Sequence, residues 1–167
     1  MAEYGTAREL FEAARASARE IDQARSTLMR MESREGVKGA GLEAIRASGT
    51  SDPMRPTDAR MDYEARISRS IAECERIIDY ACAVLYGTDY SGRDGGLYAI
   101  AEHVMADILC MHYCQDMLWQ DVANIVGYSR SQCIVKGACA IQLIDSIGIE
   151  ECIRGERPDA IGRDKPL

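Results

Sequence analysis

Aromatic residues and long hydrophobic runs are both scarce in this chain. Only 6% of its 167 residues are aromatic, and Ala, Ile, Leu and Met dominate the apolar residues, which favours helix over strand. The longest stretch without a charge is nine residues, from Tyr80 to Thr88. A membrane-spanning helix needs about 20 apolar residues, so we expect no membrane segment. Hydrophobic residues still make up 47% of the chain, which is enough to pack the core of an all-α protein.

Secretion, catalytic and phosphate-binding motifs are also missing. The first twenty residues carry seven charged side chains, unlike a secretory signal. The seven cysteines are an odd number, and without a signal they indicate free thiols in a reducing cytoplasm. No glycine-rich segment fits the P-loop pattern, and neither histidine has a recognisable nucleophile beside it. We therefore expect a cytoplasmic protein that is not an enzyme and carries no cofactor.

The nearest approach to a metal motif is the spacing of Cys110, His112 and Cys114. Residues two apart on a helix point about 200° from each other, so His112 cannot share a metal with either cysteine unless the helix unwinds. Cys110 and Cys114 are four apart and could share one, but no C-x-x-C pair provides further ligands. Free cysteines usually behave as small core residues, and we predict no metal site.

Positive charge is in short supply. The chain has 20 Lys and Arg against 27 Asp and Glu, a net charge of −7. Residues 1–70 hold 12 of each sign, whereas residues 71–167 hold 8 basic and 15 acidic residues. Such a balance does not attract nucleic acid as a whole. Any interpretation as a DNA-binding protein must therefore rest on a local arrangement.

Heptad spacing of apolar residues predicts two long helices, within residues 1–32 and 57–96. The first seam comprises Leu10, Ala14, Ser17, Ile21, Ala24, Leu28 and Met31, and the second comprises Ile67, Ile71, Cys74, Ile78, Ala81 and Leu85. We expect the two helices to pair as an antiparallel hairpin or across a dimer. Glycines and prolines predict a flexible linker at residues 33–56 and a loop at residues 87–96.

The remaining chain is expected to hold a helical domain, residues 97–150, followed by a tail, residues 151–167. Its first helix is expected from Leu97 to Cys114, because one face is apolar. Two shorter helices are expected at residues 118–126 and 130–147. Within the tail, residues 155–167 are rich in glycine and proline and are expected to fray.

The most specific local pattern lies between Trp119 and Lys136. A short amphipathic helix is expected to end at Gly127, because glycine accepts a positive φ. Tyr128 is expected to plug the turn, and Ser129 with Gln132 forms an S-x-x-Q capping box that opens a second helix. A short helix, a glycine turn and a capped second helix make a helix-turn-helix. Its expected core residues are Trp119, Val122, Ala123, Val126, Gly127, Tyr128, Cys133 and Ala140.

The residues from Trp119 to Ile144 resemble the helix-turn-helix of the fourth conserved region of bacterial sigma factors. The wider segment from Ile108 is similar to phage-encoded regulators of late transcription of the ArpU/RinA type. The matching elements are Ile108-Leu109, His112-Tyr113, Trp119, Val122-Ala123, Gly127-Tyr128-Ser129 and Ala140-Ile141. The family tends to carry Arg in place of His112 and a more basic or polar second helix. The resemblance implies a phage- or prophage-derived regulator that binds double-stranded DNA, with RNA polymerase as a further partner.

A second helix that enters a major groove presents its first exposed residues to the base edges. Arg130 suits guanine and Gln132 suits adenine, with Ser131 between them. Lys136, one turn on, would meet a phosphate or a base. Ser129 and the N–H groups at the helix start can hold a phosphate. These five residues are the predicted DNA contacts.

Only Arg130 and Lys136 are basic between residues 119 and 145, so we expect a monomer to bind DNA weakly. A homodimer formed through the N-terminal helices, help from N-terminal arginines or recruitment by RNA polymerase could compensate. Two other functions stay open. One is a phage DNA-packaging protein similar to a small terminase subunit, which would assemble into a ring. The other is a helical protein-interaction module that has lost DNA binding, which the negative net charge favours.

Overall fold

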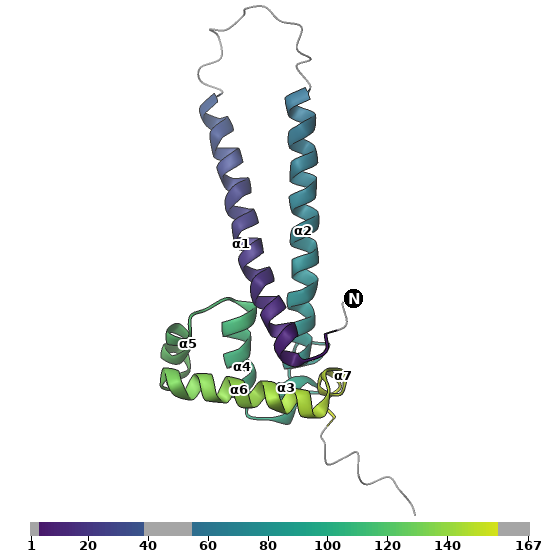
Figure 1. The fold of residues 1–167 in the computed structure, drawn as a ribbon, viewed down its shortest axis with the longest axis vertical. Helices are drawn as coiled ribbons and strands as arrows, with labels where there is room; N and C mark the ends of the chain where they lie inside the picture. Colours follow the sequence, from purple (N-terminus) through teal and green to yellow (C-terminus); the bar gives the residue numbers. More distant parts are fainter. Residues whose placement is uncertain (1–3, 39–54, 157–167) are drawn as a thin grey trace, which may run out of the picture. The chain divides into compact units, whose positions relative to one another are not determined.

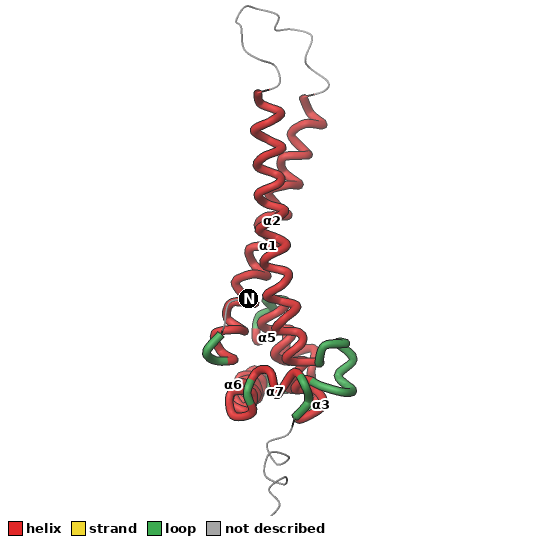
Figure 2. The backbone as a smooth tube through the Cα atoms, turned by 90° about the vertical axis from the view of Figure 1, so that its right-hand side faces the viewer, coloured by secondary structure: helices red, strands yellow, loops and turns green. Residues whose placement is uncertain are grey.

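A computed structural model describes residues 4–38 and 55–156, and all regular structure within them is helical (Figure 1). The elements are α1 (Ala7–Lys38), α2 (Arg55–Tyr86), α3 (Gly96–Ile100), α4 (His103–Leu109), the π-helical turn η1 (Cys110–Cys114), α5 (Trp119–Val126), α6 (Arg130–Ile147) and α7 (Ile149–Ile153). The predicted all-α class is confirmed, and Figure 2 shows helices and loops alone in the described residues. None of the helices described has the length and apolar character needed to cross a membrane.

The two long helices extend beyond their predicted ends. α1 includes residues 33–38, which the sequence assigned to the linker, and α2 begins at Arg55. Gly36 does not end α1. A single glycine costs a helix only about 1 kcal/mol relative to alanine, and a long helix tolerates that loss. The rest of the predicted linker, residues 39–54, lies outside the described residues.

The chain divides into two compact units, and both long helices contribute to each of them. The hairpin unit is Arg19–Cys74, and the helix-turn-helix unit comprises Met1–Ala18 and Glu75–Leu167. In the hairpin unit the two helical segments run antiparallel, and Ser70 Oγ donates a hydrogen bond to Glu20 Oε1. Ile21 is 6% exposed there. The half-buried seam residues of this unit are Ala24, Leu28, Met31, Ile67 and Ile71.

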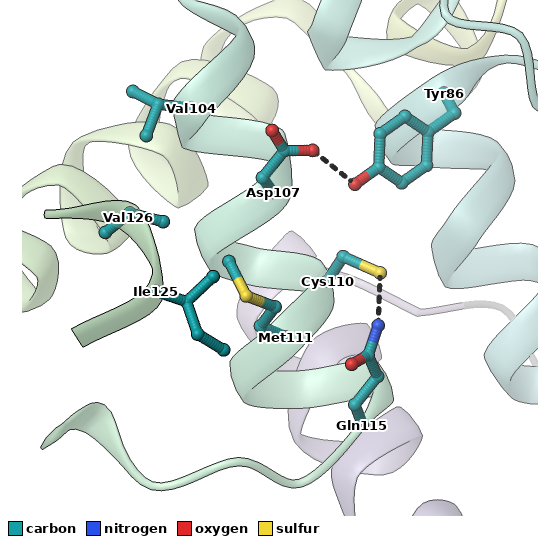
Figure 3. Close-up of a pocket in the computed structure, with 8 residues that line it drawn as sticks. All are labelled: Tyr86, Val104, Asp107, Cys110, Met111, Gln115, Ile125 and Val126. Carbon is teal, nitrogen blue, oxygen red and sulfur yellow. Dashed lines mark hydrogen bonds between the residues drawn. The ribbon is translucent and has the colours of Figure 1, made fainter. Parts of the chain in front are cut away.

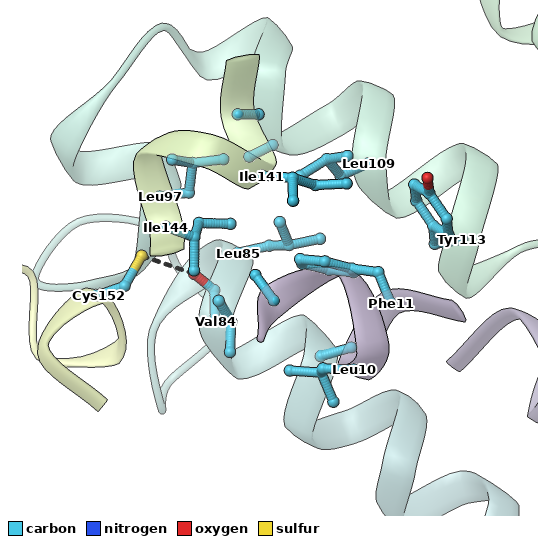
Figure 4. Close-up of a cluster of buried hydrophobic side chains, with 14 of the residues drawn as sticks. Leu10, Phe11, Val84, Leu85, Leu97, Leu109, Tyr113, Ile141, Ile144 and Cys152 are labelled. Carbon is cyan, nitrogen blue, oxygen red and sulfur yellow. Dashed lines mark hydrogen bonds between the residues drawn. The ribbon is translucent and has the colours of Figure 1, made fainter. Parts of the chain in front are cut away.

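The core of the helix-turn-helix unit gathers residues from both ends of the chain (Figure 4). Phe11 near the start of α1, Leu85 near the end of α2 and Ile144 of α6 are all fully buried in one cluster. The N–H of Ala7 donates to Asp145 Oδ1 at 2.6 Å, which satisfies a free donor at the start of α1. The first turns of α1 therefore belong to the same core as α6.

The helix predicted from Leu97 to Cys114 is divided into α3, α4 and η1. Ala101 and Glu102 have extended backbones between α3 and α4. In an unbroken helix Tyr98 and His103 would point about 140° apart. The break instead lets their rings stack with centroids 3.9 Å apart, and this contact stabilises the interruption.

The start of the predicted tail is part of the core. Cys152 and Ile153 of α7 are 0% and 8% exposed. The helical domain therefore continues beyond residue 150, where the sequence predicted its end. Apolar side chains at these positions account for it, because they pack against the cluster that contains Leu97. Residues 157–167 of the predicted tail lie outside the described residues.

Candidate nucleic-acid interface

α5 and α6 are joined by the short turn that the sequence predicts. Gly127 adopts a φ of 74°, and its N–H donates to Ala123 O at 3.0 Å, which closes α5. Ser129 Oγ accepts a hydrogen bond from the N–H of Gln132 at 3.2 Å. The N–H of Ser129 donates in return to Gln132 Oε1 at 2.9 Å. This reciprocal capping box fixes where α6 begins.

The inner faces of α5 and α6 form a small core with α4. Its buried residues are Ile108, Val122, Ala123 and Cys133, with Trp119 and Val126 partly buried against them. Ala140, farther along α6, is fully buried in the main core. A Cβ on Gly137 would lie 3.0 Å from Trp119 Cη2, so the indole crosses α6 directly over this glycine. The absence of a side chain at Gly137 thus allows α5 and α6 to approach closely.

Buried His112 anchors the residue that opens α5. Its Nδ1 lies 2.8 Å from Met117 O and its Nε2 lies 2.9 Å from Arg15 Nη1. A carbonyl only accepts and a guanidinium only donates, so Nδ1 carries the proton and the ring is neutral. The imidazole stacks on Trp119 at 3.7 Å, and Arg15 also pairs with Asp116 at 2.6 Å. Burial lowers the pKa of His112.

Tyr128 does not plug the turn, contrary to expectation. It is 38% exposed, and its ring centroid lies 5.3 Å from Lys136 Nζ. Lys136 Nζ also pairs with Glu102 Oε2 at 2.6 Å, and this hydrogen bond raises the pKa of the lysine. The ring therefore lies beside the lysine, where a cation–π contact is available. One of the two cations predicted to meet DNA already has a carboxylate partner.

The exposed polar residues on the first turn of α6 are Arg130, Ser131 and Gln132. Among the residues that the structure describes, Arg130 forms no ion pair. Ser129 and Gln132 are also exposed, but their side chains are engaged in the capping box. Of the five predicted contacts, Arg130 and Ser131 are therefore the best placed to meet a ligand.

Apolar side chains continue the exposed face of α6. Val135 is 60% exposed and Ile134 is 39% exposed, and both lie about one turn beyond Arg130 and Ser131. Such methyl groups can contact the C5-methyl of thymine or pack against another protein. The outer face of α6 thus joins one cation and one hydroxyl to an apolar surface.

Three cysteines that are separated in the sequence meet in the fold. Cys82 of α2 and Cys110 and Cys114 of η1 have Sγ atoms that all lie within 4.8 Å of one another. A hydrogen bond from Cys114 lowers the pKa of Cys110, and the bond with Cys110 raises the pKa of the other two thiols. The sequence pairs Cys110 with Cys114 by spacing, but no local signal points to Cys82.

A pocket of about 470 Å³ opens beside Cys110 (Figure 3). Its other lining residues are Tyr86, Val104, Asp107, Met111, Gln115, Ile125 and Val126. Gln115 Nε2 donates to Cys110 Sγ at 3.7 Å, and the Tyr86 hydroxyl donates to Asp107 Oδ1 at 2.9 Å. The pocket thus reaches one of the three clustered cysteines.

No protein-family model matches the chain, and no curated protein or solved structure matches it. The resemblance to ArpU/RinA-type regulators therefore rests on the residues from Ile108 to Ile144 and stays a prediction.

Proposed function

We propose that this protein binds double-stranded DNA through the start of α6 and regulates transcription. The observation that carries the proposal is the exposed first turn of α6, capped by Ser129 and Gln132 and joined to α5 by a closed glycine turn. A helix of this kind fits the major groove, which is about 12 Å wide, with its first residues toward the bases. The resemblance to phage regulators supports the finer assignment to transcription.

Arg130 and Ser131 are the proposed first contacts with DNA. A guanidinium can donate two hydrogen bonds to guanine O6 and N7, whereas a hydroxyl suits either a base or a phosphate. Ile134 and Val135 lie one turn farther along and are suited to thymine methyl groups. Lys136 has a smaller proposed role, because its Nζ already forms an ion pair with Glu102 Oε2 at 2.6 Å.

Ser129 and Gln132 are proposed to position α6 rather than to read bases. Their side chains satisfy each other's backbone N–H groups, so a bidentate contact of Gln132 with adenine, which also uses Oε1, would require the capping box to open. The N–H groups at the start of a helix have no partner within it and favour an anion. A phosphate bound there would set the register of α6 on the duplex.

A second copy of the chain is part of the proposal, because one α6 carries too few cations for tight binding. The hairpin unit has exposed apolar residues for this purpose: Met29 is 67% exposed and Met61 is 62% exposed. Two copies related by a twofold axis would double the phosphate contacts and read a palindromic site. Contacts with RNA polymerase would also raise the affinity of the protein for its DNA site.

Selection of duplexes from a random pool tests the proposal with the reduced, full-length chain. We expect enrichment of a motif with guanine followed by thymines, and an affinity that falls as salt rises. The absence of enrichment, with no duplex bound at low salt by a chain whose circular dichroism is helical, would remove the proposal. Light scattering on the same sample is expected to show a dimer, whereas a ring would favour a packaging role.

A protein-interaction function is the second candidate, and the exposed apolar residues of α5 and α6 favour it. Val135, Ile134 and Ile125 are 60%, 39% and 62% exposed, and the net charge is −7. Binding of a protein to this face would depend on the apolar side chains and little on salt. Arg130→Ala separates the two candidates, because loss of DNA binding in this variant supports the DNA-binding function, whereas Ile134→Ser/Val135→Ser is expected to weaken binding under either one.

A further inference from the structure

We propose that Cys82, Cys110 and Cys114 form a three-thiolate site for one soft metal ion. Their Sγ atoms all lie within 4.8 Å of one another. The ligands come from α2 and from η1, two elements that are distant in the sequence. The site therefore depends on the folded helix-turn-helix unit and is separate from the exposed face of α6.

The separation of the three sulfur atoms is close to what a metal ion requires. A zinc–thiolate bond is about 2.3 Å long, which places sulfur ligands roughly 3.7–4.0 Å apart in tetrahedral or trigonal geometry. Small rotations of the cysteine side chains would bring the three atoms to that distance. Cys110 and Cys114 lie in a π-helical turn, in which the N–H of Gln115 donates to Cys110 O at 3.1 Å. Turns of this kind are frequent at functional sites.

The surroundings differ from those of a cysteine that only fills the core. Cys133 and Cys152 are fully buried among apolar residues, whereas Cys82 and Cys110 are only partly buried. Cys110 lines the pocket of Figure 3, so the pocket reaches one of the three proposed ligands. The amide of Gln115 donates to Cys110 Sγ at 3.7 Å, and hydrogen bonds of this kind orient metal ligands.

The donor set indicates which ions the site would take. Three thiolates select soft ions, of which Cu(I) and Zn(II) are the common cellular examples. Within the described residues no histidine nitrogen or carboxylate oxygen joins the cluster. Cu(I) is satisfied by three sulfur ligands, whereas Zn(II) would need a fourth ligand such as water. For either ion the protein supplies only sulfur ligands and binds a single ion. The two ions give different spectra, which tells them apart.

Metal binding would join the end of α2 to the segment that leads into α5. An ion that binds only the folded state raises the free energy of unfolding. Cys114 and Trp119 flank the connection between η1 and α5, so the fluorescence of this tryptophan reports on the same region. We therefore expect the bound form to unfold at a higher temperature than the metal-free form.

The test titrates the reduced, metal-free, full-length protein anaerobically, in separate arms, with Cu(I) against a chromogenic chelator and with Zn(II) or Co(II). We expect one ion per chain in at least one arm and a higher unfolding temperature. Three sulfur neighbours in X-ray absorption would indicate Cu(I), and a tetrahedral Co(II) spectrum would indicate a fourth, external ligand. The variants Cys82→Ser and Cys110→Ser should each lose at least about tenfold in affinity. Cys139→Ser is the matched control, because this exposed cysteine lies outside the cluster.

Either of two results would overturn the site. One is a folded, reduced protein that binds neither ion stoichiometrically. The other is a Cys82→Ser variant that keeps the wild-type affinity, since a pair of cysteines on η1 would then suffice. Circular dichroism of each variant shows whether a loss reflects the ligand or the fold. Because Cys82 and Cys110 are half-buried, we expect both serine variants to remain helical.

Discussion

A matched pair of glycine substitutions tests the backbone geometry of the helix-turn-helix unit. Gly96→Ala and Gly127→Ala add the same methyl group to backbones with φ values of 79° and 74°. A left-handed backbone costs a non-glycine residue roughly 1–2 kcal/mol, so this part of the loss is common to both variants. The two sites differ in burial and in the space around the new methyl group, because Gly96 is buried and Gly127 is exposed.

The space around Gly96 is already occupied by backbone. A Cβ there would lie 2.4 Å from the Gly87 nitrogen and 2.5 Å from the Tyr86 nitrogen, whereas a Cβ on Gly127 meets nothing within 4 Å. Forcing extra volume into a packed region costs about 1–3 kcal/mol more. We therefore expect losses of roughly 1–2 kcal/mol for Gly127→Ala and about 2–5 kcal/mol for Gly96→Ala.

Urea unfolding followed by tryptophan fluorescence measures both losses. Trp119 is the one tryptophan in the chain, and it lies in the helix-turn-helix unit, so its signal reports this unit. Equal losses in the two variants, or a larger loss for Gly127→Ala, would refute the close contact between the start of α3 and the end of α2.

Three further predictions concern the pH dependence, the cap and the core. Burial lowers the pKa of His112 in the folded state, so the unfolded chain binds more protons below its ordinary pKa of about 6.5. The free energy of unfolding therefore falls as the pH drops through that value. Thermal unfolding should show a flatter pH dependence for His112→Gln than for the wild type, and an unchanged slope would contradict the burial of a neutral ring. Ser129→Ala removes the Oγ acceptor of the capping box and is expected to cost about 1 kcal/mol in urea unfolding; an unchanged midpoint would contradict this role. Phe11→Ala empties a fully buried site and should cost about 3–5 kcal/mol, and a loss below 1 kcal/mol would show that α1 does not complete this core.

The features that could be predicted from the sequence are those with local causes. The S-x-x-Q pattern of Ser129 and Gln132 gave the capping box, because both hydrogen bonds join residues three positions apart. Gly127 gave the end of α5, because its backbone requires a positive φ. The heptad spacing of Leu10 and Ala14 gave a buried face of α1, because helical periodicity places them on one side.

The features that could not be predicted join distant parts of the chain. Arg15 meets His112, and Cys82 meets Cys110, although no periodicity links either pair. The ion pair between Glu102 and Lys136 depends on the break between α3 and α4 and removes a cation that the sequence assigned to DNA. Tertiary contacts of this kind are fixed by packing and have no counterpart in local spacing.

The most direct test of the central claim is the affinity of Arg130→Ala for the selected duplex, measured by fluorescence anisotropy. The matched control is Arg93→Ala, which removes the same charge from an exposed position in the loop between α2 and α3. We predict that Arg130→Ala weakens binding by about fivefold to a hundredfold, the range for losing a bidentate base contact, and that Arg93→Ala binds within about twofold of the wild type. Equal affinities for the two variants would contradict the claim that α6 carries the DNA-binding surface.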